Sequence, residues 1–534
     1  MYLGYFPENI DAEKAFDNFA LGQTLSATSS SPSAIRTLSF FGRANYSYDD
    51  RYIATVTLRA DGSSKFARGH RWGYFPAVAL AWRASNEKFL RDYTWISNLK
   101  LRASIGMSGN DRIDSDLFLK LYKLGDQSKS AGWGEKGGYY YEFASKYPVN
   151  PDIKWETTIT RNLGIDFGFL NGKIDGSFDV YWNTTKDLLL ETILPGDTGF
   201  TSMMTNVGQT SNKGFEVNLN AWVFENKDWT VGLNFNIGLN RGKIDKLNKG
   251  ENELIREANV DSYAYGVFRH QVGQSIGNIY GFVNDGMYTL DDFNITPDAK
   301  GHYVYELKEG IVNSKILCEP QPGTPKFKEL VDDGTHELNP DKDRTVIGNT
   351  TPDFSGGFGV NVKYRDFDLA AQFNYMVGFD VININKMKLS TVNSSKTVYQ
   401  NLEGSFANMW HNFDAQGSNV KQDAPEVLRQ MNANATMWDP TNMTKTFVST
   451  YCVEDGSFMR LQNLTLGYTI PSKLTKKIGM SRCRFYATGY NLFTITNYSG
   501  YDPEVNIGEG LSPNQDYNMY PRSRSYTFGV QVSF

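Results

Sequence analysis

Acidic side chains are concentrated in one stretch of the sequence, which runs from Asp332 to Asp343 and includes Gly334. Carboxylates grouped around a glycine are typical Ca²⁺ ligands, so Asp332, Asp333, Asp341 and Asp343 are candidate metal ligands. The spacing departs from the twelve-residue calcium loop, because the acid at the fifth position and the closing glutamate are missing. We therefore interpret the stretch as a solvated acidic turn and predict no cofactor, with bound Ca²⁺ as the alternative.

Aromatic side chains recur in two long segments without strand periodicity, 108–156 and 380–456. An exposed aromatic ring offers a flat apolar surface that can stack on a sugar face. The candidates for contact with a substrate or a protein partner are Trp133, Tyr139, Tyr140, Tyr141, Trp410 and Trp438. The alternatives are that these rings pack the segments internally or belong to an interfacial aromatic girdle.

Residues of hydrolytic or metal-dependent catalysis do not occur here in a catalytic pattern. The five histidines show no HExxH or paired spacing, and no GxSxG sequence stands in a convincing strand-to-helix setting. The three cysteines form neither a CxxC motif nor a disulfide framework. We predict that the chain is not an enzyme, that it has no catalytic residues, and that its cysteines are unpaired. These residues are His70, His270, His302, His336, His411, Cys318, Cys452 and Cys483.

Strict alternation of apolar and polar residues dominates the segments that must position these side chains. Between Trp229 and Leu239 the odd-numbered residues are apolar and the even-numbered ones are Thr, Gly or Asn. This period of two indicates a strand, because the apolar positions of an amphipathic helix recur every three or four residues. The same pattern predicts an all-β chain with thirteen strands. They are 38–48, 51–61, 73–83, 97–107, 157–169, 173–186, 213–224, 228–241, 354–364, 367–379, 457–470, 482–493 and 523–534.

The connections between the predicted strands alternate between short and long. Short ones such as 49–50 and 365–366 alternate with long ones such as 108–156 and 242–353. Outer-membrane barrels have short periplasmic turns and long extracellular loops, and their tilted strands need about nine to eleven residues. We therefore predict a large antiparallel transmembrane barrel in the cell outer membrane, with a periplasmic C-terminus and an extracellular segment over residues 1–37.

Composition agrees with a β-rich membrane protein. Aromatic residues make up 14% of the chain and there are 49 glycines, a mixture that suits strands and turns. The mean hydropathy is −0.45, and no apolar run reaches about 18 residues, which excludes a helical membrane span. Charged residues of both signs are mixed, with a net charge of −5, so nucleic acid is not an expected partner. The polar rows cannot form a dry core, so we expect a hydrated or plugged lumen in a barrel of about 22 strands.

Several stretches, taken in order, resemble the SusC/RagA-like family of TonB-dependent transporters. The resemblance runs from about residue 38 to the C-terminus. It implies that residues 38–534 are the C-terminal portion of the barrel, about thirteen strands, and that signal peptide, TonB box and plug are absent from this chain. The stretches are Phe41–Tyr48, Leu58–Phe66, Trp72–Pro76, Trp82–Phe89, Leu99–Asn110, Asn150–Glu156, Asn206–Glu216, Asp455–Leu461, Leu466–Pro471, Asn491–Phe493 and Ser499–Glu504.

The resemblance implies active import of glycans, energised through TonB and paired with a SusD-like surface lipoprotein, within outer-membrane lipid. Oligopeptide import of the RagA type is one alternative, and a non-functional barrel fragment is another. A soluble β-rich glycan-binding module is the alternative from a different class of protein. Solubility separates it from the transporter, because a half-barrel with lipid-facing Phe367, Leu369 and Phe373 should aggregate without detergent.

Overall fold

The structure is a computed structural model, and it describes most of the chain. The described residues are 35–119, 122–124, 141–143, 147–248, 252–256, 265–392, 401–442, 447–508 and 510–534. The segment predicted to be extracellular, 1–37, lies almost wholly outside the described residues. No helix within the described ranges is long and apolar enough to cross a membrane.

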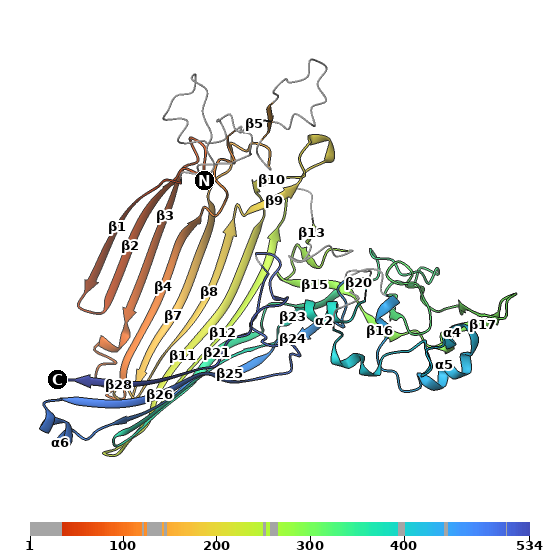
Figure 1. Ribbon diagram of the computed structural model, residues 1–534. Helices are drawn as coiled ribbons and strands as arrows, with labels where there is room; N and C mark the ends of the chain where they lie inside the picture. Colours follow the sequence, from red (N-terminus) through yellow and green to blue (C-terminus); the bar gives the residue numbers. More distant parts are fainter. Residues whose placement is uncertain are drawn as a thin grey trace, which may run out of the picture.

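One sheet of thirteen antiparallel strands dominates the fold and confirms the all-β prediction (Figure 1). Each strand pairs with the next long strand along the chain, and β1 and β28 stand at the two edges of an open sheet. The strands are β1 (Thr37–Tyr48), β2 (Tyr52–Ser63), β3 (Trp72–Arg83), β4 (Ile96–Asn110), β7 (Glu156–Phe169), β8 (Ile174–Lys186), β11 (Gln209–Glu225), β12 (Trp229–Lys246), β21 (Phe354–Tyr364), β22 (Phe367–Val377), β25 (Phe458–Thr469), β26 (Arg482–Thr496) and β28 (Ser525–Ser533).

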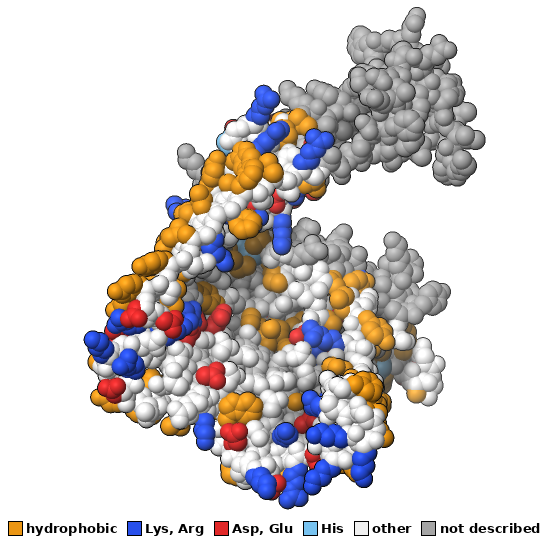
Figure 2. Space-filling model, turned by 90° about the vertical axis from the view of Figure 1, so that its left-hand side faces the viewer, with side chains coloured by type: hydrophobic (Ala, Val, Ile, Leu, Met, Phe, Trp, Pro, Cys, Tyr) orange, Lys and Arg blue, Asp and Glu red, His pale blue; other side chains and the backbone are white. Residues whose placement is uncertain are grey.

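The two faces of this sheet differ in chemistry, as the alternation predicted. In β11 and β12, Leu219 lies opposite Phe235 on one face, whereas Asn218 lies opposite Asn236 on the other. The apolar face is not covered by protein, since Phe235 is 39% exposed and Phe528 is 80% exposed. Figure 2 shows such hydrophobic side chains standing on the surface along the strands. Apolar area of this extent is stable only against a partner or lipid.

Short connections gather at one end of the sheet and long ones at the other (Figure 1). The short ones use residues with positive φ, for example Asp49 and Asp50 at 51° and 50°. Asp and Asn tolerate this left-handed conformation, which tight hairpins require. Two of the longer turns at this end contain short helices, η2 (Ala84–Asn86) in one and α6 (Ser472–Thr475) with η8 (Lys476–Ile478) in the other.

The long connections fold into small sheets and helices of their own. The described parts of 265–353, 378–456 and 497–524 pack together, and we call them the loop assembly. Its strands are β14 (Phe268–Gln271), β15 (Asn278–Phe282), β16 (Asn284–Met287), β17 (Phe293–Pro297), β18 (Tyr303–Leu307), β19 (Pro325–Phe327), β20 (Arg344–Asn349), β23 (Asp380–Asn383), β24 (Val453–Asp455) and β27 (Gln515–Asp516). Its helices are η5 (Leu290–Asp292), α2 (Ile384–Leu389), η6 (Gly404–Asn408), α4 (Val420–Asp423), α5 (Pro425–Met431) and η7 (Pro440–Asn442).

The strand β13 (Glu253–Arg256) pairs with β14 at the edge of the loop assembly. Other short elements lie in the remaining connections. They are β5 (Tyr122–Leu124), β6 (Tyr141–Phe143), β9 (Leu189–Ile193), η4 (Gly196–Thr198) and β10 (Ser202–Asn206).

The buried hydrophobic core lies mainly in the loop assembly rather than behind the main sheet. Phe268, Ile279, Ile382 and Ile384, from β14, β15, β23 and the start of α2, have no exposed surface and pack as one cluster. All three cysteines are buried and free, as predicted. Segments far apart in sequence therefore share one core at this end of the sheet.

Candidate functional site

Uncharged amide side chains line the polar face along the middle of the main sheet. Asn220 lies opposite Asn234, next to the pair of Asn218 and Asn236. Each amide carries both donors and acceptors, so this face can bond a ligand that has hydroxyl or peptide groups. The amide oxygens of Asn183, Asn212 and Asn374 are buried without a hydrogen-bond partner among the described residues.

Charged side chains on the polar face are mostly paired with one another. Arg102 contacts Asp166 at 2.7 Å and Asp179 at 3.0 Å, and Lys100 contacts Asp166 at 2.6 Å. On the same face, near the edge strand β28, the guanidinium of Arg484 donates to Asp368 at 2.5 Å. Such pairs neutralise one another, and the face between them presents amides together with two carboxylates, Asp175 and Glu216, that have no ion pair among the described residues.

Arg460 fastens the loop assembly to the polar face. Its side chain is only 2% exposed and contacts Asp502 at 2.6 Å and Glu504 at 2.7 Å. Its Nε also donates to the hydroxyl of Thr494 in β26 at 2.9 Å. The segment after β26 is therefore held against the inside of β25 and β26 by a buried ion-pair network. The motif search missed it, although Arg460, Asp502 and Glu504 all lie in stretches that carry the family resemblance.

A short parallel ladder joins two loops of the assembly. Ile382 in β23 pairs with Gln515 in β27, and β24 adds on the other side of β23. Beside it, the Tyr498 hydroxyl donates to the carboxylate of Asp516 at 2.7 Å. Burial raises the pKa of the Asp516 carboxyl above its ordinary value. These contacts tie the segment after β26 to the segment after β22.

The structure places Trp410 and Trp438 inside the loop assembly. Trp410 is 4% exposed, and its ring lies against the backbone of Gly323, which has a φ of +87°. Trp438 is 6% exposed and makes an edge contact with Tyr451, with ring centroids 4.6 Å apart. Both rings thus pack inside the loop assembly, which was the alternative to ligand contact. Contact of either ring with a ligand stays a prediction, and it would require the loop assembly to open.

The other aromatic candidates lie between residues 133 and 141. Trp133, Tyr139 and Tyr140 lie outside the described residues. Tyr141 begins β6, which pairs with β5, but its side chain is not among those described. Their contact with a substrate or partner stays a prediction.

The candidate metal ligands are engaged mainly by protein groups. The Asp343 side chain is buried and accepts backbone N–H bonds from Leu330 at 2.8 Å, Val331 at 3.2 Å and Asn339 at 2.7 Å. The carboxylate of Asp333 accepts from Lys342 Nζ at 2.8 Å, and this hydrogen bond lowers the pKa of the Asp333 carboxyl. Both carboxylates therefore stabilise the turn through hydrogen bonds to groups within it.

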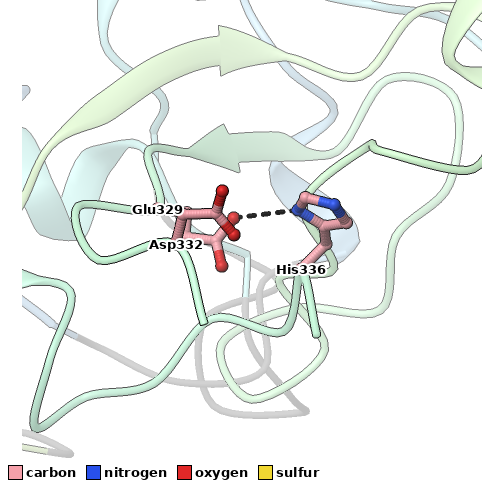
Figure 3. A group of neighbouring side chains, drawn as sticks. All are labelled: Glu329, Asp332 and His336. Atoms are coloured by element: carbon pink, nitrogen blue, oxygen red, sulfur yellow. Dashed lines mark hydrogen bonds and ion pairs between the residues drawn. The ribbon is translucent and has the colours of Figure 1, made fainter. Parts of the chain in front are cut away.

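A different trio brings potential ligand atoms together in the same turn. Atoms of Glu329, Asp332 and His336 lie within 4.8 Å of one another (Figure 3). Nδ1 of His336 and Oε2 of Glu329 are 3.1 Å apart, and this hydrogen bond raises the pKa of the imidazole. Of the four predicted ligands only Asp332 belongs to the trio. Glu329 lies three residues before Asp332, outside the acidic stretch of Asp332 to Asp343, so the sequence pattern did not indicate it.

Known proteins resemble this chain over nearly its whole length. Residues 3–492 match the family model described as TonB dependent receptor-like, beta-barrel. TonB-dependent receptor P3 of Formosa agariphila is 31% identical over 533 residues, which are 98% of this chain and 48% of that protein. TonB-dependent receptor SusC of Bacteroides thetaiotaomicron is 31% identical over 511 residues, 93% of this chain and 44% of that protein.

Solved structures resemble it as well. A chain of the RagAB peptide transporter aligns with a TM-score of 0.70 and 25% identity, covering 94% of this chain and 48% of its own length. The chain thus spans about half the length of the relatives that it matches.

Proposed function

Because this chain belongs to the TonB dependent receptor-like β-barrel family of outer-membrane proteins, we propose that it forms part of the wall of an active importer of glycans. The observation that carries the proposal is the two-faced main sheet. Its apolar face is exposed over thirteen long strands, which suits lipid, while its other face is lined by amides and paired charges. We propose no catalytic role, in keeping with relatives that are receptors and transporters.

Glycan is the proposed substrate class because a row of amides lies in the middle of the polar face, beside the carboxylates of Asp175 and Glu216, and both kinds of group can bond hydroxyls. Hydroxyl groups of a sugar can donate to and accept from an amide at the same time. The amides of Asn218, Asn220 and Asn236 are exposed along this face. The resemblance of the sequence to the SusC/RagA-like family implies the same class. Oligopeptide import is the second candidate, supported by the likeness to the RagAB peptide transporter.

The organisation of the transporter completes the proposal. Residues 38–534 form the C-terminal portion of the barrel wall, residues 1–37 lie on the extracellular side, and the short connections face the periplasm. The loop assembly then stands outside the cell, where a SusD-like lipoprotein is the proposed partner. Energy is proposed to come through TonB.

Cell fractionation followed by an uptake assay tests the proposal. The protein should sediment with the outer membrane and leave it only in detergent. Cells that lack the gene should lose uptake of labelled neutral oligosaccharides and regain it on complementation. Loss of oligopeptide uptake instead would favour the second candidate. A monodisperse protein in detergent-free buffer would contradict both and favour a soluble binding module.

A further inference from the structure

A groove crosses the apolar face at the end of the sheet that carries the short connections. Its volume is about 780 Å³, and it runs over β21, β22, β25, β26 and β28. Two neighbouring rows of paired residues form it. The row nearer the turns is Tyr364, Phe367, Tyr468, Phe485 and Val530, and the next row is Val362, Leu369, Leu466, Ala487 and Phe528.

Differences in side-chain size create the depression. Ala487 is the smallest member of its row and lies between Leu466 and Phe528, whose side chains stand well into solvent at 54% and 80% exposure. The neighbouring row is largely aromatic, and its Phe367 and Phe485 are 58% and 47% exposed. The result is a narrow apolar channel with a low floor, which is the shape that a hydrocarbon chain fills.

A basic turn borders the groove. The connection from β25 to β26 holds α6 and η8, and Lys473, Lys476 and Lys477 are all exposed in it. No acidic residue occurs between Ile470 and Ser481, and none of the three lysines has an ion pair in the part of the chain that the structure describes. The turn therefore presents three free positive charges.

The turn lies close to the groove because it directly follows β25, which lines the groove. Tyr468 of the groove precedes Pro471 at the start of the turn by three residues, which is about 10 Å along a strand. The far end of the turn is anchored where Ser481 N donates to the carbonyl of Ser533 at 2.7 Å. Figure 1 shows α6 at the same end of the sheet as the C-terminus, and Figure 2 shows basic side chains gathered at the lower end of the molecule.

The same turn also carries exposed apolar side chains. Leu474 is 55% exposed and Ile478 is 66% exposed, four residues apart. Apolar residues next to lysines are typical of segments at a membrane interface, where the ammonium groups reach the headgroup layer while the apolar side chains enter the hydrocarbon.

We propose that the groove and the basic turn together bind one anionic glycerophospholipid. One acyl chain lies in the groove over Ala487, and the phosphate contacts Lys473, Lys476 and Lys477. This inference rests on the proposed function, because it requires the apolar face to lie in a bilayer with the short connections at a phospholipid leaflet. Basic clusters beside a membrane attract anionic headgroups, while neutral headgroups gain nothing from them.

Retention of lipid by the detergent-purified full chain tests the proposal. Phosphatidylglycerol, phosphatidylcholine and lipopolysaccharide are added separately, and bound lipid is counted by native mass spectrometry. We expect phosphatidylglycerol to be retained in preference to both others. The variant K473Q/K476Q/K477Q should bind phosphatidylglycerol at least about tenfold more weakly, given the contribution of each basic residue at an anionic surface.

The matched control removes three lysines from other turns at the same end of the sheet. Lys88, Lys173 and Lys227 are exposed and have no ion pair among the described residues, so K88Q/K173Q/K227Q changes the net charge equally. This control should bind as the wild type does. A second variant, A487F, fills the groove without a charge change and should also reduce retention.

Two sets of outcomes separate the inference from the proposed function. Equal losses in both triple variants, unchanged binding in A487F, or equal retention of phosphatidylcholine or lipopolysaccharide would overturn the lipid site while the protein still requires detergent. If instead the protein is soluble without detergent, the proposed function itself fails.

Discussion

At the scale of single residues, Arg460 illustrates how one side chain determines the position of a whole loop. Its guanidinium is removed from water and is balanced by Asp502 and Glu504 of the connection after β26. A buried charge that loses its partner is costly, whereas an exposed pair contributes little because water screens it. The loop assembly therefore depends on this buried contact far more than on the many ion pairs at its surface.

We expect Arg460→Ala to destabilise the loop assembly by about 3–5 kcal/mol, because the Asp502 carboxylate would be left buried without its cation, while Glu504 would keep only its ion pair with Arg522. The measurement is thermal or urea unfolding in detergent, together with limited proteolysis in 497–524. Arg365→Ala is the control, since Arg365 pairs with Asp228 at the surface. If the Arg460 and Arg365 variants unfolded at the same temperature and urea concentration, the role assigned to the ion-pair network would be contradicted.

The pair of His336 and Glu329 predicts a pH dependence in one turn. The folded-state pKa of His336 is raised, first by its hydrogen bond to Glu329. The stabilisation is therefore fully present below the ordinary histidine pKa of about 6.5 and is lost as the pH rises through the raised folded value.

Hydrogen exchange in 329–343, followed from below this window to above it, measures the effect. Exchange should speed up beyond its intrinsic base catalysis as the pH rises. His336→Gln should abolish this extra pH dependence. A variant with the same profile as the wild type would show that the pair does not stabilise the turn.

At the scale of elements, the long strands could be predicted from the sequence and the loop assembly could not. A period of two over ten or more residues locates a strand such as β12, and the structure confirms all thirteen to within a few residues. The strands of the loop assembly have two to six residues, too few to show a period. The parallel pairing of β23 with β27 joins segments more than a hundred residues apart, which no local pattern encodes.

The candidate site divides in the same way. The polar rows of the sheet follow from alternation, but the burial of Trp410 depends on its contact with Gly323, far away in the chain. The engagement of Asp343 with three backbone N–H groups likewise depends on how the turn closes on itself. Aromatic and acidic residues were therefore found as candidates while their packing roles were not visible.

Gly323→Ala should destabilise the loop assembly for two reasons. Its φ of +87° costs an L-residue about 1–2 kcal/mol, and the new Cβ would overlap the ring of Trp410. Gly310→Ala is the matched control, since Gly310 has a φ of +82° with no atom within 4 Å of the new Cβ. Tryptophan fluorescence during unfolding should show a larger loss of stability for Gly323→Ala. Equal losses would mean that the ring contact is not tight.

At the scale of the whole molecule, the main sheet behaves as a wall between two media. Its apolar rows have no protein cover within the described residues, and its polar rows carry amides and paired charges. Stability must then come from the bilayer on one side and from hydrogen bonds on the other, instead of from a single dry core. The loop assembly is the part of the molecule with a conventional hydrophobic core.

Adjacent positions in β12 test this division. Phe235→Lys places a charge on the apolar face and should cost about 2–4 kcal/mol of stability in lipid, measured by urea unfolding in liposomes. Asn234→Lys, one residue earlier on the polar face, should fold and insert normally. If the two variants were equally tolerated, the apolar face would not be in contact with lipid.

The parallel ladder between β23 and β27 has a consequence for biogenesis. Among the described residues, β23 (380–383) pairs with β24 on one side and acquires its neighbour on the other side from residues 515–516. A polypeptide delivered amino end first must therefore carry β23 with one edge unpaired until residues 515–516 have arrived. Completion of the loop assembly thus reports that the chain has been delivered at least as far as residue 516, and translation that stops before this point leaves one edge of β23 unpaired and open to proteases.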